Sequence, residues 1–183
     1  MRDHMTKKLS PHFADYELQC KCHRHKNKPL CNVSPRLLML SERVRDELKT
    51  PMIPTSCCRC PEHNKEVGGS PTSKHITTDK QPSRAMDFKA KGMISVLAFD
   101  AIVRDWACGG LGELGGIGLY DTFVHIDTAK AEDGHLRVWD ERKKKTTADS
   151  EILGQLVEDL RGLTSARPAA VINRLCIALN EWR

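Results

Sequence analysis

The segment GIGLYDTFVHIDTA, residues 116–129, has the pattern of a β-hairpin that turns near Asp121. Side chains alternate between the two faces of a strand with a period of two, so Phe123, His125 and Asp127 share one face of its second strand. The opposite face carries apolar and β-branched side chains. Taken alone, this is also the pattern of an edge strand whose polar face meets solvent, where a single histidine is usually inert.

Outward from the hairpin, helices and strands alternate irregularly. The sequence predicts helices over 34–48, 93–107, 150–162 and 167–181, strands over 51–56, 85–90 and 135–141, and a long loop over 57–84. Because the strands cluster late, we expect an α+β fold, with a small antiparallel sheet and flanking helices. Residues 1–142 are expected to form one domain and 143–183 a C-terminal helical extension.

Composition excludes some function classes. The chain has 183 residues, enough for a sizeable core, and a mild net charge of +5. Its apolar runs are far shorter than the ~20 residues of a membrane span, so no membrane partner is expected. The N-terminus carries no secretory pattern, which predicts synthesis in the cytoplasm. Basic residues are scattered without a groove-reading motif, so a nucleic-acid partner is the weakest hypothesis.

A possible metal site joins the hairpin to residues before it. His75 ends a Gly/Ser loop, and Asp87 lies in the apolar strand segment AMDF. A carboxylate there is costly to bury unless it is paired or bound to a cation. With His125, these residues offer two imidazoles and a carboxylate, a set that suits zinc and leaves a fourth position for water. We therefore hypothesise that His75, Asp87 and His125 bind one metal ion.

Six of the eight cysteines fall in two further clusters. CKCHRH, residues 20–25, is followed by Cys31, and CCRC occupies residues 57–60. One hypothesis is a structural zinc that joins the two loops through Cys20, Cys22, Cys31 and one CCRC thiol. The alternatives are free, partly buried thiols and a disulfide.

Five stretches, taken together, resemble the M15 metallopeptidases, the D-alanyl-D-alanine carboxypeptidase group that includes phage endolysins. They are SPHFADYELQC, LLMLSERVRDEL, TSCCRCPEHNKEVGGSPTSKH, RAMDF and GIGLYDTFVHIDTA, in that order over about residues 10–129. The resemblance implies a hedgehog/D-Ala-D-Ala peptidase-like fold and Zn²⁺ bound by His75, Asp87 and His125. It also implies hydrolysis of peptidoglycan stem or cross-link peptides, and a phage enzyme released to the cell wall.

The resemblance implies further roles near the metal. Arg59 would bind a substrate carboxylate or carbonyl, for which the planar guanidinium is well shaped. Ser73 is a second substrate-binding candidate. Asp127 and Asp121 are both candidates for the general base, because the position three residues before His125 holds no acid. Asp127 has an alternative role, which is to orient a histidine.

One departure from the family pattern concerns the interval between His75 and Asp87, which is longer here than in the family. The added residues include Asp79, which competes with Asp87 as a ligand. We prefer Asp87 because RAMDF has the family's strand pattern. The insert is expected to bulge beside the cleft as a flap that shapes the substrate site.

The leading functional hypothesis is therefore a zinc peptidase. The alternative is a non-catalytic zinc-containing binding module, or a phage structural component, on the same scaffold, because the general base is not obvious from the sequence.

Overall fold

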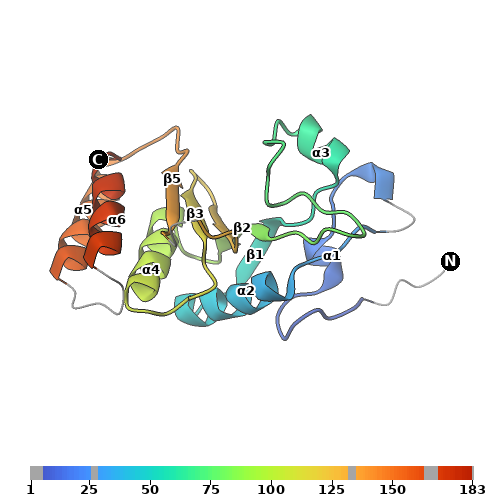
Figure 1. Cartoon of the computed structure of the whole chain (residues 1–183), viewed down its shortest axis with the longest axis horizontal. Helices are drawn as coiled ribbons and strands as arrows, with labels where there is room; N and C mark the ends of the chain where they lie inside the picture. The colour runs from blue at the N-terminus through green and yellow to red at the C-terminus, as the bar shows by residue number, and fades with distance from the viewer. Residues whose placement is uncertain (1–5, 26–28, 132–134, 163–168, 183) are drawn as a thin grey trace.

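One five-stranded sheet organises the computed structural model, which describes residues 6–25, 29–131, 135–162 and 169–182. Its strands lie in the order β1-β2-β4-β3-β5 (Figure 1). The strands are β1 (Met52–Ser56), β2 (Ala85–Ala90), β3 (Gly116–Leu119), β4 (Val124–Asp127) and β5 (Arg137–Asp140). Together with the helices, this arrangement confirms the α+β class.

β3 and β4 form the predicted hairpin, which turns near Asp121. Ile117 pairs with Ile126 and Gly118 with His125, while on the other side of β4 Asp87 pairs with His125. β4 is thus a central strand, with a neighbour on each side, and the edge-strand interpretation is wrong. All four of its residues are buried. The alternation therefore separates two buried faces, an apolar one and a polar one.

The sheet is mixed, which corrects the expectation of an antiparallel one. β5 pairs in parallel with β3, with Gly118 opposite Trp139. The reason is topological: the chain leaves β4, reverses, and crosses to the far side of β3. A strand that runs opposite to β4 must run in the same direction as β3, and the local strand pattern does not specify which neighbour it will join.

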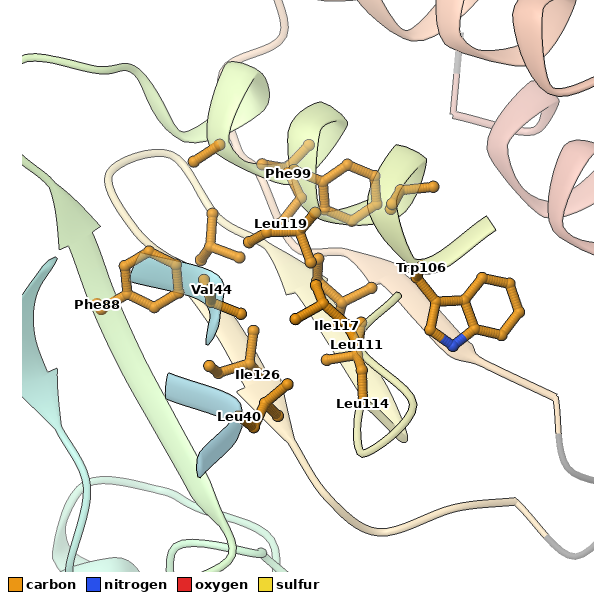
Figure 2. Packing of buried hydrophobic residues seen from close by; sticks show 14 of the residues in the cluster. Leu40, Val44, Phe88, Phe99, Trp106, Leu111, Leu114, Ile117, Leu119 and Ile126 are labelled. Carbon is orange, nitrogen blue, oxygen red and sulfur yellow. The ribbon is translucent and has the colours of Figure 1, made fainter. Parts of the chain in front are cut away.

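The apolar face of the sheet is covered by α2 (Pro35–Leu48) and α4 (Ser95–Ala107). Figure 2 shows Leu40 of α2 and Phe99 of α4 directed toward the side chains of the strands. The buried residues of this core include Leu37, Leu40, Val44, Phe88, Phe99, Ile102, Ile117, Leu119, Val124 and Ile126. Because the two helices pack on the apolar face, the side chains on the polar face of the sheet are left to form a functional site.

Two C-terminal helices, α5 (Thr147–Gly162) and α6 (Ala169–Asn180), pack on each other, and α5 also contacts α4 (Figure 1). The Trp182 ring lies 5.7 Å from that of Phe99, centroid to centroid, which ties the chain end to the core. Residues 167–168 of the predicted last helix lie outside the described residues. Within the described part of the chain, no helix is long and apolar enough to cross a membrane. The domain boundary at residue 142 stays a prediction.

A short helix interrupts the predicted loop 57–84. This helix, α3 (Pro61–Glu66), was not predicted, because it is too short to show an apolar period in the sequence. Two signals were present, since Cys60 is its N-cap and Pro61 occupies its first position. At the N-terminal side, α1 (Asp15–Leu18) and the 3₁₀ turn η1 (His23–His25) precede α2. Figure 1 shows α1 near β1, whereas Arg24 of η1 is hydrogen-bonded to Glu66 of α3.

Candidate metal centre

Three buried side chains from distant segments meet on the polar face of the sheet. His75 comes from the loop after α3, Asp87 from β2 and His125 from β4. Asp87 Oδ1 lies 3.2 Å from His75 Nε2 and 2.7 Å from His125 Nδ1, and the two nitrogens are 3.2 Å apart. The side chains are buried, with 3% of His75 and 6% of Asp87 exposed. The group predicted from the sequence is therefore brought together.

The outer ring nitrogens of the two histidines already have acceptors. His75 Nδ1 lies 2.9 Å from the carbonyl oxygen of Cys57, and His125 Nε2 lies 3.2 Å from Asp127 Oδ2. Because a carbonyl and a carboxylate can only accept, each outer nitrogen carries the proton of a neutral imidazole. Lone pairs on the two inner nitrogens and on Asp87 Oδ1 then converge on one point. Such a convergence is stable only around a positive species, a proton or a metal ion.

The titration of these groups is consistent with a site for positive charge. Burial lowers the pKa of His75, which favours the neutral ring that a metal requires. Burial by itself would raise the pKa of Asp87, but the facing His75 and His125 hold it well below its usual range. Burial likewise opposes the charged form of His125, yet Asp127 and Asp87 raise its pKa on balance.

The donor set fits zinc. Two imidazole nitrogens and one carboxylate oxygen leave one position of a tetrahedron open, as in catalytic zinc sites. Zinc–ligand bonds of ~2.0–2.1 Å in a tetrahedron separate the ligand atoms by ~3.3 Å. The three separations here, 3.2, 3.2 and 2.7 Å, come close to this value.

Arg59 is hydrogen-bonded to Asp87 through the carboxylate oxygen that does not face the two histidines. Its Nη2 donates to Asp87 Oδ2 at 2.8 Å, and its Nε donates to Ser56 Oγ at 2.8 Å. Among the described residues, Nη1 has no recorded hydrogen-bond partner, and Arg59 lines the cleft above the group. Arg59 thus orients Asp87 and still has a donor available for a ligand in the cleft.

Asp127 lies behind His125, on the ring nitrogen that faces away from the group. Its Oδ2 meets His125 Nε2, while its Oδ1 accepts from Arg137 Nη2 at 2.6 Å and from the Ala129 amide at 2.8 Å. A Cβ atom at Gly116 would collide with Asp127 and Arg137, so this close arrangement requires glycine there. The geometry favours the orienting role of Asp127 over the role of general base.

An open cleft of about 680 Å³ lies over the group. The loop from Val67 to Lys74 forms one part of its lining, and aromatic side chains form another. The rings of Tyr120 and Phe123 stack at 4.3 Å between centroids, and Trp139 lies 5.1 Å from the His125 ring. The lining thus combines hydrogen-bonding groups with apolar side chains, which suits an extended ligand such as a peptide.

Three cleft residues in the last strand segment were not predicted from the sequence. Arg137, Trp139 and Glu141 all line the cleft. Their spacing of two was visible in RVWDE, but the neighbour of this strand was not. Trp139 pairs with Gly118 of β3, and its indole lies over that glycine. A Cβ atom at position 118 would collide with the indole. Glu141 supplies a carboxylate for which no hydrogen bond or ion pair is recorded among the described residues.

The remaining predicted residues divide between the cleft and other places. Ser73 lines the cleft, and its Oγ accepts from the His75 amide at 3.3 Å. Asp121 is exposed and does not line the cleft. Its Oδ1 accepts from the amides of Lys143 and Lys144, both at 3.1 Å, so it holds the segment after β5.

The insert after His75 does not form a flap beside the cleft, and that expectation is wrong. Its side chains and backbone pack on the segment before α2, where Thr77 Oγ1 donates to the Asn32 carbonyl at 3.0 Å. Asn32 Nδ2 in turn donates to the Thr78 carbonyl at 2.8 Å. Asp79 lines a different pocket and is not part of the His75 group. Hydrogen bonds between side chains of one loop and backbone carbonyls of the other thus hold the insert against the segment before α2, away from the cleft.

A buried His/Asp/His group with one open position, at the base of a peptide-sized cleft, is the arrangement of a catalytic metal centre in a hydrolase. The family model described as Peptidase M15 matches residues 11–127, which is more than half of the chain. The chain therefore belongs to the M15 peptidases, and it is a zinc-dependent metallopeptidase that acts on a peptide substrate. Neither a search of curated proteins nor a search of solved structures found a match.

Asp127→Asn tests the orienting role directly. The amide keeps the size of the side chain but weakens its hold on His125 Nε2, so zinc affinity should fall by about 10–100-fold. Activity should return when zinc is supplied in excess. Zinc competition with a chromogenic chelator measures the affinity. Unchanged affinity together with lost activity would instead make Asp127 the general base.

Proposed function

We propose that this metallopeptidase hydrolyses peptidoglycan stem or cross-link peptides, as a D,D-carboxypeptidase or endopeptidase. The observation that carries the proposal is the donor of Arg59 beside the metal group. Arg59 lines the cleft and is anchored through Nε and Nη2, so its Nη1 is held in place. A fixed guanidinium donor suits the terminal carboxylate of a short peptide, or the carbonyl next to the bond that is cut.

His75, Asp87 and His125 would hold the zinc ion. Zinc bound there supplies Lewis acidity, which polarises the scissile carbonyl and lowers the pKa of a water molecule toward ~7. The protein fixes the direction of the three ligands through Cys57, Arg59 and Asp127, each of which contacts one of them. The ligands therefore need little rearrangement when the metal enters.

Glu141 is the acid that we assign as the general base. Asp87 and Asp127 are both occupied by hydrogen bonds, whereas the carboxylate of Glu141 lines the cleft and has no hydrogen bond or ion pair to another residue in the part of the chain that the structure describes. It takes a proton from the attacking water as the oxygen bonds to the carbonyl carbon. It then passes this proton to the amide nitrogen as the carbon–nitrogen bond breaks, so that an acid and an amine are released.

Purified peptidoglycan is the test substrate. We expect release of D-alanine or of cleaved stem peptide, detected by mass spectrometry, and loss of this release after treatment with a chelator and its return with zinc. Ordinary L-peptides of the same length serve as the comparison. Cleavage of L-peptides alone would refute the peptidoglycan proposal while leaving the metallopeptidase intact.

Arg59→Lys should impair turnover of substrates that end in a free carboxylate. Lysine keeps the charge but cannot hold Ser56, Asp87 and a substrate oxygen at once, and a lost charge-assisted hydrogen bond costs about 1.5–3 kcal/mol. This predicts a decrease of about 10–100-fold in kcat/KM. The same peptide with an amidated C-terminus is the control, and it should be less affected. An equal decrease for both peptides would show that Arg59 does not bind the substrate carboxylate.

A further inference from the structure

A second group of metal-ligand side chains lies away from the cleft. Cys20 and Cys22 follow α1, His25 ends η1, and Cys60 caps α3. One ligand atom from each of these four residues lies within 4.8 Å of the others. The group therefore connects two separate segments of the chain, residues 20–25 and the start of α3.

The distances between the sulfur atoms fit a metal-thiolate site. Cys20 Sγ and Cys22 Sγ are 3.5 Å apart, and Cys22 Sγ and Cys60 Sγ are 3.7 Å apart. Zinc–sulfur bonds of ~2.3 Å in a tetrahedron place two sulfur atoms ~3.8 Å apart. A disulfide would need ~2.05 Å, and all eight cysteines are free here.

A ring nitrogen of His25 gives independent evidence for a bound ligand. Its Nε2 is buried and has no hydrogen-bond partner among the described residues. A buried polar nitrogen without a partner costs about 1–3 kcal/mol, so such atoms are rare unless something satisfies them. Beside three sulfur atoms, a neutral imidazole nitrogen is the usual fourth zinc ligand.

Two backbone amides donate hydrogen bonds to the sulfur atoms of this group. The Cys60 amide donates to Cys20 Sγ at 3.3 Å, and the His63 amide donates to Cys60 Sγ at 3.4 Å. Arg24 donates through Nη1 to Glu66 Oε2 at 2.8 Å, which fastens η1 to α3. Amide donors directed at sulfur stabilise the negative charge that a metal ligand carries.

We propose that Cys20, Cys22, His25 and Cys60 bind a structural zinc ion, in a closed site that clamps the loop after α1 to the start of α3. The ligand set differs from the one hypothesised from the sequence, since His25 replaces Cys31. The other nearby thiols have different neighbours: Cys57 Sγ contacts Ser83 Oγ at 3.9 Å, and Cys58 Sγ contacts the Asn32 carbonyl at 3.5 Å.

The clamp would also position the catalytic cleft. Cys60 directly follows Arg59, whose amide donates to the His75 carbonyl at 2.9 Å and whose carbonyl accepts from the Thr77 amide at 2.8 Å. A metal that fixes Cys60 therefore restrains the backbone of both Arg59 and His75. With four protein ligands and no open position, this second ion would take no part in the reaction.

Metal analysis of the full chain tests the proposal. The wild type should hold about two zinc ions, and His125→Ala and Cys22→Ser should each hold about one. Cys108→Ser is the matched control, because Cys108 is exposed and belongs to neither group, and it should keep both ions. His125→Ala with no bound zinc, or Cys22→Ser with both ions, would overturn the proposal.

Cobalt substitution of the intact chain covers the case in which Cys22→Ser does not fold. In His125→Ala loaded with Co²⁺, thiolate-to-cobalt charge transfer should give a strong near-ultraviolet absorption, and chelation should abolish it together with part of the thermal stability. Absence of this band in a folded protein would refute the site. The proposed ligand set would also be refuted if Cys31→Ser lost the absorption band while His25→Ala kept it. That result would make Cys31, and not His25, the fourth ligand.

Discussion

His125→Ala should lose one zinc ion per chain and reduce peptide hydrolysis to the level of a reaction without enzyme. His125 Nδ1 is in direct contact with both other members of the group, at 2.7 Å from Asp87 Oδ1 and 3.2 Å from His75 Nε2. Alanine leaves two ligands, which are too few for the three-ligand catalytic site. It also leaves the buried Asp87 carboxylate with one partner fewer, which adds to the loss.

Elemental analysis and an activity assay on the same preparation measure both effects, and circular dichroism checks the fold. His12→Ala is the control, since His12 is exposed, pairs with Glu42 at 2.7 Å and is not a member of the metal group. It should keep metal and activity. Hydrolysis that persists in His125→Ala after chelation would show that the reaction does not depend on this group.

Glu141→Gln should retain zinc and lower kcat by about 10²–10⁴-fold, the usual loss when a general base is removed. Glutamine keeps the shape of the side chain but cannot accept a proton. Arg137 and Trp139 share the face of the sheet that carries His125. Glu141, directly after β5, lines the same cleft and is its carboxylate without a hydrogen bond or ion pair among the described residues. The KM should change little, because the substitution leaves the Arg59 donor in place.

Asp121→Asn is the matched control, and it also tests the alternative base from the sequence analysis. Because Asp121 holds the amides of Lys143 and Lys144, its variant should show near wild-type kcat and at most a small loss of stability. Steady-state kinetics with zinc in excess compare the two variants. A large loss in Asp121→Asn with normal activity in Glu141→Gln would reverse the assignment.

The roles of Asp127 and Asp121 show that the distance of an acid from His125 along the sequence does not predict its function. Both acids lie within four residues of His125, and both were reasonable general bases on that ground. The structure directs Asp127 to the outer nitrogen of His125 and Asp121 to the backbone after β5. Proximity along a strand fixes which face a side chain occupies, but it does not fix the atom that the side chain meets.

The cysteine clusters gave a similar result. One of the hypotheses from the sequence joined the two loops through a zinc ion, and the structure does bring Cys20, Cys22 and Cys60 together. The fourth member, His25, could not be chosen over Cys31, because the choice depends on the path of η1 and on its link from Arg24 to Glu66. These are contacts between segments about forty residues apart.

The sequence by itself determined the features that follow from local backbone geometry. Alternation along 116–129 separates core residues from His125, and the apolar setting of Asp87 marks it as a paired or metal-bound carboxylate. Only the tertiary structure decided that β5 joins β3 in parallel and brings Trp139 and Glu141 to the cleft. The physical reason is that hydrophobic burial, which assembles the sheet, is non-directional, so the neighbour of each strand depends on how the whole chain packs.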